Sequence, residues 1–116
     1  MILRIWATSI VEGCEASYLK FAQDRSRLMF LSQPGCLGVL FLKSVDGKHA
    51  ACSFWKSEED IAALANSLMY KSTVSDLLAT GVLAGEASIS LYDVEGGAMQ
   101  SSDFSNELEQ ETLTIT

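Results

Sequence analysis

The sequence is poor in the residues from which metal sites and acid–base sites are commonly built. It contains one proline, one histidine and three cysteines among 116 residues. The cysteines, Cys14, Cys36 and Cys52, lack Cys-x-x-Cys spacing and form no metal-ligand cluster with His49. We therefore predict free thiols and no metal site, and we expect His49 not to be a ligand.

Long apolar runs are also missing. No stretch approaches the roughly 20 consecutive apolar residues that a membrane-spanning helix requires. The start of the chain, Met1-Ile2-Leu3-Arg4, lacks the basic region, apolar region and cleavage site of a signal peptide. The sequence therefore predicts a cytoplasmic protein that does not enter the membrane.

Positive charge is absent from the C-terminal part of the chain. Residues 1–94 contain ten acids and eight bases, whereas residues 95–116 contain five acids and no base. This distribution offers no basic surface for nucleic acid or for anionic lipid. We predict a globular domain over residues 1–95 and an acidic tail over residues 96–116, with a hinge at Glu95-Gly96-Gly97.

Within the tail, residues 111–116 alternate between polar and apolar side chains in the manner of a strand. We expect the tail to lie against the domain or a partner subunit, with pairing to an exposed sheet edge as one way to do so.

The spacing of apolar residues predicts the order βαββαβ. Strands are expected at residues 2–10, 36–43, 50–55 and 87–94, the middle two joined by a hairpin turn at Asp46-Gly47. Helices are expected at residues 15–32 and 57–80, the second loosened at Asn66-Ser67. This order matches the α+β ferredoxin-like plan, a four-stranded antiparallel sheet with two helices on one face.

The two middle strands carry apolar residues on both sides. Residues 37–42 and 51–55 do not alternate with polar residues, as they would if the second face of the sheet were open to water. We therefore predict a homodimer in which a second copy of the chain covers that face.

The junction between a predicted strand and a predicted helix at residues 53–60 indicates a pocket. Ser57 and Asp60 have the spacing of a capping box, so Trp55 lies where the third strand ends and a helix starts. Sheet and helix diverge at such junctions and leave concave surface. Only aromatic side chains supply a candidate site: Trp6, Tyr18, Phe21, Trp55, Tyr70 and Tyr92, with Arg4 as the single cation inside a predicted strand.

Several segments resemble the antibiotic biosynthesis monooxygenase (ABM) family of dimeric α/β barrels. They are Gln33-Pro34-Gly35-Cys36-Leu37-Gly38, residues 53–60, Tyr70, and Tyr18 with Phe21. The resemblance covers about residues 1–95. It implies two subunits packed sheet to sheet, each with a pocket between sheet and helices. Some relatives oxygenate polycyclic phenols without metal or flavin, and others degrade haem.

The resemblance makes haem degradation the less expected activity. Haem-degrading relatives are similar at Trp55, but they also use a histidine where Val74 stands and an asparagine where the first strand offers Ala7 or Thr8.

The sequence is compatible with two functions. In the first, the protein is a cofactor-independent monooxygenase of an aromatic or polyphenolic molecule, with Trp55 as the catalytic residue and Trp6, Tyr18, Phe21 and Tyr70 binding the substrate. In the second, it is a barrel that binds or senses a small aromatic metabolite without chemistry. The same rings would also serve as ordinary core residues.

Overall fold

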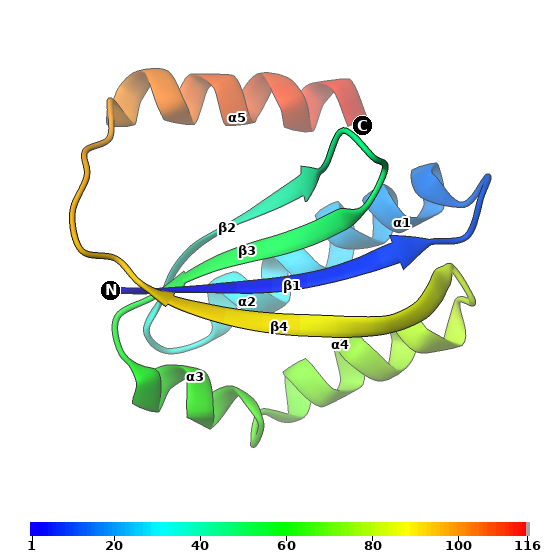
Figure 1. The fold of residues 1–116 in the computed structure, drawn as a ribbon, viewed down its shortest axis with the longest axis horizontal. Helices are drawn as coiled ribbons and strands as arrows, with labels where there is room; N and C mark the ends of the chain where they lie inside the picture. The colour runs from blue at the N-terminus through cyan, green and yellow to red at the C-terminus, as the bar shows by residue number, and fades with distance from the viewer. Residues whose placement is uncertain (116) are drawn as a thin grey trace.

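The structure is a computed structural model that describes residues 1–115 of the chain. Four strands form one antiparallel sheet in the order β2-β3-β1-β4, namely β1 (Ile2–Ile10), β2 (Cys36–Lys43), β3 (His49–Trp55) and β4 (Leu83–Asp93). Helices α1 (Glu15–Phe21), η1 (Ala22–Ser26), α2 (Arg27–Ser32), α3 (Glu58–Leu64) and α4 (Leu68–Ala79) lie on one face of the sheet (Figure 1). The predicted α+β ferredoxin-like arrangement is confirmed.

Strand β1 shows how the two faces of the sheet differ. Its residues Ile2, Arg4 and Thr8 are buried beneath the helices, whereas Leu3 and Ile5 point to the opposite face and are only half-buried. This is the period of two expected for a strand. Residues directly opposite each other on paired strands point to the same side of the sheet. The register therefore shows which residues of the neighbouring strands face the helices and which face the open side.

The first helical segment contains a π-helical turn that the spacing of apolar residues did not predict. Residues Ala22–Ser26 form this turn in the middle of the predicted helix over residues 15–32. A π turn adds one residue to a turn of the helix, so the side chains that follow it are rotated about the helix axis. Consequently Phe30 is buried, whereas Leu28 is 52% exposed.

The junction after β3 forms as predicted. The Ser57 hydroxyl accepts a hydrogen bond from the Asp60 backbone N–H at 3.3 Å and donates one to the Asp60 carboxylate at 2.9 Å. Gly35 of the preceding turn has a φ of +80°, and a Cβ atom there would collide with the Asp60 side chain. The turn and the helix start therefore fit together only with glycine at this position.

The predicted second helix is divided in two, as the residues Asn66-Ser67 suggested. Helix α3 ends at Leu64, and the Ser67 hydroxyl begins α4 by accepting a hydrogen bond from the Tyr70 backbone N–H at 3.1 Å. Strand β4 begins at Leu83, four residues earlier than predicted.

The prediction of a strand in the tail is wrong for the residues that the structure describes. Ser101–Ile115 form helix α5, in which the apolar residues Phe104 and Leu108 are one turn apart. Thr116 lies outside the described residues. Helix α5 runs beside edge strand β2 (Figure 1), and a groove lined by both elements separates them. The tail thus lies alongside the domain but does not pair with the edge of its sheet.

The buried residues between sheet and helices form two clusters. One contains Trp55 with Met29, Phe30, Ala51 and Leu64. The other contains Tyr18, Leu77 and Val82, and Trp6 packs against both clusters. Among the described residues, no helix combines the length and apolar character needed to cross a membrane.

Candidate functional site

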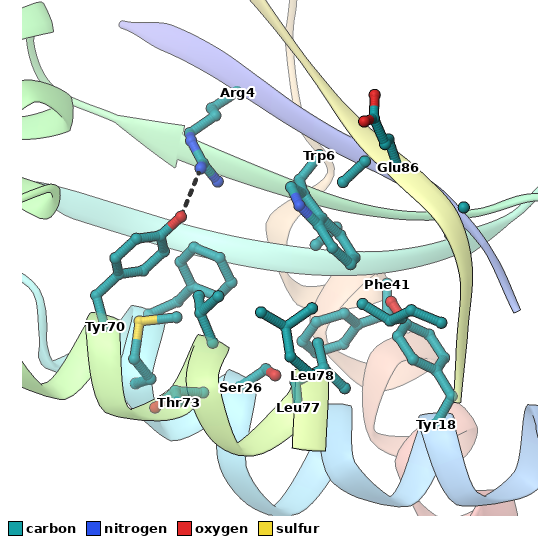
Figure 2. A pocket seen from close by; sticks show the side chains of 17 residues that line it. Arg4, Trp6, Tyr18, Ser26, Phe41, Tyr70, Thr73, Leu77, Leu78 and Glu86 are labelled. Carbon is teal, nitrogen blue, oxygen red and sulfur yellow. Dashed lines mark hydrogen bonds between the residues drawn. The ribbon is translucent and has the colours of Figure 1, made fainter. Parts of the chain in front are cut away.

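A cavity of about 480 Å³ lies between the sheet and the helices α1, α2 and α4 (Figure 2). Its interior is formed by buried side chains, among them Arg4, Tyr18, Met29, Phe30, Ala51, Thr73 and Leu77. Exposed residues at its rim are Leu78, Gly85, Glu86 and Ala87. The cavity therefore opens to solvent between α4 and the start of β4.

A break in the pairing of β1 with β4 shapes this mouth. The register shifts between Ala7 and Ser9, and Gly85 on β4 has a φ of +86° that favours glycine. The extra residues of the bulge place Glu86 at the rim of the cavity.

Arg4 is the only cation among the described residues that line the cavity. It is 4% exposed, and its guanidinium donates a hydrogen bond to the Tyr70 hydroxyl at 3.2 Å. The guanidinium carbon also lies 5.8 Å from the centre of the Tyr70 ring, within range of a cation–π interaction. No carboxylate of residues 1–115 forms an ion pair with Arg4.

Trp55 does not line the cavity, so its predicted place on the pocket wall is wrong. Its side chain is fully buried in the cluster with Met29 and Leu64. The register explains this position: Trp55 pairs with Ile2 at the end of the sheet near α3, whereas the cavity lies above Arg4 and Trp6.

Trp55 is nevertheless connected to Arg4 through a buried serine. The indole N–H of Trp55 donates a hydrogen bond to the Ser53 hydroxyl at 2.8 Å. That hydroxyl donates a longer one, at 3.4 Å, to the backbone carbonyl of Arg4. The three residues hold β1 and β3 together below the charged end of the cavity.

Tyr18, one of the predicted binding residues, lines the interior of the cavity and is only 3% exposed. Burial raises the pKa of its hydroxyl to about 12, so Tyr18 is a neutral hydrogen-bond donor at physiological pH. Its ring meets that of His49 edge to face, with centres 5.2 Å apart. His49 is buried beyond Tyr18 and does not itself line the cavity.

The remaining predicted residues divide between the cavity and other places. Trp6 and Tyr70 line the cavity. Phe21 does not line the cavity. Its ring centre lies 5.4 Å from the guanidinium carbon of Arg25, and its side chain packs against the second cluster. Tyr92 pairs with Leu3 and so points to the opposite face of the sheet.

Most aliphatic residues of the site were not predicted from the sequence. On α4, the lining residues Tyr70, Thr73, Val74 and Leu77 have the spacing of one helix face. That spacing could have revealed them. Glu86 carried no such signal, because its position depends on the bulge.

The arrangement suits a flat, mostly apolar ligand. Rings and aliphatic side chains form the walls, and polar contact is available from Arg4, from Tyr70 and from the neutral hydroxyl of Tyr18. Such a site can exclude water from a ligand and hold a negative charge on it.

No family model and no curated protein matches the sequence. Solved structures do match the fold. A protein of Nitrosomonas europaea named as an antibiotic biosynthesis monooxygenase is 20% identical, with a TM-score of 0.67 over 83% of this chain and 100% of that one. SnoaB, a cofactor-independent oxygenase from Streptomyces nogalater, is 12% identical, with a TM-score of 0.66 over 83% of this chain and 94% of its own. The chain has the ABM fold.

A protein of Arabidopsis thaliana shares this ABM fold as well. It is 12% identical, with a TM-score of 0.69 over 85% of this chain and 100% of that one. The predicted resemblance to the ABM proteins is thus confirmed at the level of the fold.

Proposed function

We propose that the cavity binds a flat phenolic molecule and that the protein oxygenates it without a cofactor. The observation that carries this proposal is the apolar cavity with one buried cation, Arg4, at its inner end. The similarity in fold to SnoaB, a cofactor-independent oxygenase, supports it.

In such a reaction the substrate itself reduces oxygen. For an anthrone, the ring methylene becomes a carbonyl: two C–H bonds break, one oxygen atom joins the carbon, and the other leaves as water with the two hydrogens. The substrate must first lose a proton and become electron-rich. Arg4 would stabilise the resulting oxyanion, because a positive charge in a dry site strongly favours the ionised form of a bound phenol or enol.

The other residues would position the substrate. Trp6 and Tyr70 offer rings for stacking, worth about 0.5–1.5 kcal/mol for each aromatic pair, and Tyr18 can donate a hydrogen bond. Trp55, predicted to be catalytic, lies outside the cavity and would support the backbone of Arg4 through Ser53, which is a contribution to stability. Phe21 has no part in this proposal, since it lies outside the cavity.

The alternative is a barrel that binds a metabolite without chemistry. Among the described lining residues there is no histidine, and the one carboxylate, Glu86, is at the exposed rim. An evident general base is therefore missing from the interior, which favours binding alone. Val74 lies on the cavity wall, where the resemblance places a histidine in haem-degrading relatives. That position makes haem degradation the least favoured function.

The homodimer through the open face of the sheet and the cytoplasmic location are part of the same proposal. The half-buried apolar residues Leu3 and Ile5 on that face support a dimer.

Oxygen uptake with a panel of hydroquinones and anthrones, with and without a metal chelator, tests the proposal. We expect uptake above buffer that survives chelation, and a large loss of it in Arg4→Met with Arg27→Met unaffected. Binding of the same compounds without uptake would establish the alternative. Breakdown of added haem with reductant would instead establish haem degradation, the least favoured function.

A further inference from the structure

We infer that the ligand of this cavity is an anion: an aromatic molecule whose carboxylate or ionised hydroxyl is bound by Arg4 and Tyr70. The inference rests on the proposed function only in taking the cavity as the ligand site. It adds the charge of the ligand and the place where that charge is held.

The reason is that Arg4 is buried without a counter-ion among residues 1–115. Its side chain is 4% exposed, and no acid of the described chain pairs with it. A buried charge without a partner is unfavourable, so such groups are normally paired or bind an ion. An anionic ligand would supply the missing partner.

The hydrogen bonding around Arg4 leaves capacity for that ligand. A guanidinium has five N–H groups, and the side chain of Arg4 makes one hydrogen bond in the described structure, to the Tyr70 hydroxyl. Since the Tyr70 oxygen accepts this bond, its own proton is available to the ligand. The Arg4 guanidinium and the Tyr70 hydroxyl thus lie side by side at one end of the cavity (Figure 2).

The rest of the cavity fixes the orientation. Glu86 is at the rim, on the other side of Trp6 from Arg4 in Figure 2, and the two form no ion pair, so their charges do not neutralise each other. The space between them is lined by Trp6, Phe41 and Leu77. The anionic group would therefore lie at the inner end, and the ring would extend toward the mouth.

Calorimetric titration with 2-naphthoate and with its uncharged analogue 2-naphthalenemethanol tests the inference without oxygen or turnover. We expect wild-type protein to prefer the acid. Arg4→Met should weaken naphthoate binding by about 10- to 100-fold, the range for a hydrogen bond to a charged group, and leave the alcohol unchanged. Arg27→Met removes an exposed arginine of α2 and should behave as wild type.

A second titration distinguishes the two kinds of anion. A nitrophenol changes its absorbance on ionisation, and bound to wild-type protein it should ionise at lower pH than when bound to Arg4→Met. The titratable protein groups that line the cavity are Tyr18 from α1, Tyr70 from α4 and Glu86 from β4, and all three are unchanged in that variant. A lower ionisation pH of the nitrophenol on wild-type protein, without selective binding of naphthoate, identifies a phenolate site. Selective binding of naphthoate, without a change in the ionisation of the nitrophenol, identifies a carboxylate site.

Equal affinity for acid and alcohol together with an unshifted nitrophenol, no effect of Arg4→Met on either anion, or no binding of any anion would overturn the inference. If Arg4→Met does not fold, Arg4→Gln tests the same loss of charge. Charge-selective binding without oxygen uptake would refute the oxygenase and keep the anion site. Undiminished uptake in Arg4→Met would refute the anion site and keep the oxygenase.

Discussion

Replacing Trp55 by phenylalanine separates a structural from a catalytic role for this residue. The change removes the indole N–H that donates to Ser53 at 2.8 Å and reduces the size of a fully buried ring. Because Trp55 does not line the cavity, we expect a loss of stability in place of a selective loss of turnover.

The magnitude follows from two contributions. Leaving the buried Ser53 hydroxyl with one partner fewer costs about 1–3 kcal/mol. A void of roughly 40 Å³ among Met29, Phe30 and Leu64 costs about 1 kcal/mol, at about 24 cal/mol per Å³. The free energy of unfolding should therefore fall by about 2–4 kcal/mol, which lowers Tm by about 8–16 °C for a domain of this size.

Urea denaturation measures this loss, with Trp6→Phe as the matched control. Trp6 is half-buried, and its indole makes no hydrogen bond within the described structure. The same chemical change there should cost about 1 kcal/mol or less. Equal losses for the two variants, or a stable Trp55→Phe protein that binds ligand but has lost its turnover, would refute this reasoning.

Three further predictions concern the dimer, the tail and Tyr18. Tyr92, which is 56% exposed on the open face, should be essential for dimerisation: Tyr92→Asp should halve the mass measured by light scattering, whereas Val45→Asp in the exposed hairpin turn should not. A monomeric wild-type protein would contradict the dimer. Deleting residues 98–116 should lower thermal stability and speed hydrogen exchange in β2, because α5 flanks that strand; unchanged values would show that α5 adds nothing. The raised pKa of Tyr18, about 12, means that the unfolded chain loses this proton at lower pH than the folded one. Stability should therefore fall as pH rises from about 10 to about 12, by about 2–3 kcal/mol more in wild type than in Tyr18→Phe, and equal slopes would contradict the burial of that hydroxyl.

Most of the fold could be predicted from the sequence, because the local signals in the chain agree with the long-range packing of its strands and helices. Alternation in β1, the Asp46-Gly47 turn and the Ser57 cap each act over a few residues, and each formed as predicted. The π turn at Ala22–Ser26 has no comparable local signal, so the exposure of Leu28 was not foreseen. The last residues of the tail have an ambiguous pattern, and the helical spacing of Phe104 and Leu108 prevailed over the alternation.

The site was less predictable than the fold, because it depends on where the strands align. Trp55 and Trp6 lie on the same face of the sheet, yet the register puts one beneath α3 and the other beneath the cavity. A sequence shows which side a strand residue faces, but not which helix covers it. Arg4 was visible as a cation in a strand, whereas its lack of a counter-ion within residues 1–115 depends on where the whole fold places the acidic side chains.

The most direct measurement of the central claim is the fate of molecular oxygen with chelator-treated protein and an anthrone substrate. With isotopically labelled oxygen gas, we predict one labelled atom in each product molecule and one O₂ consumed for each product formed, with a rate that depends on Arg4. No consumption above buffer by wild-type protein, with substrates that it demonstrably binds, would contradict the oxygenase.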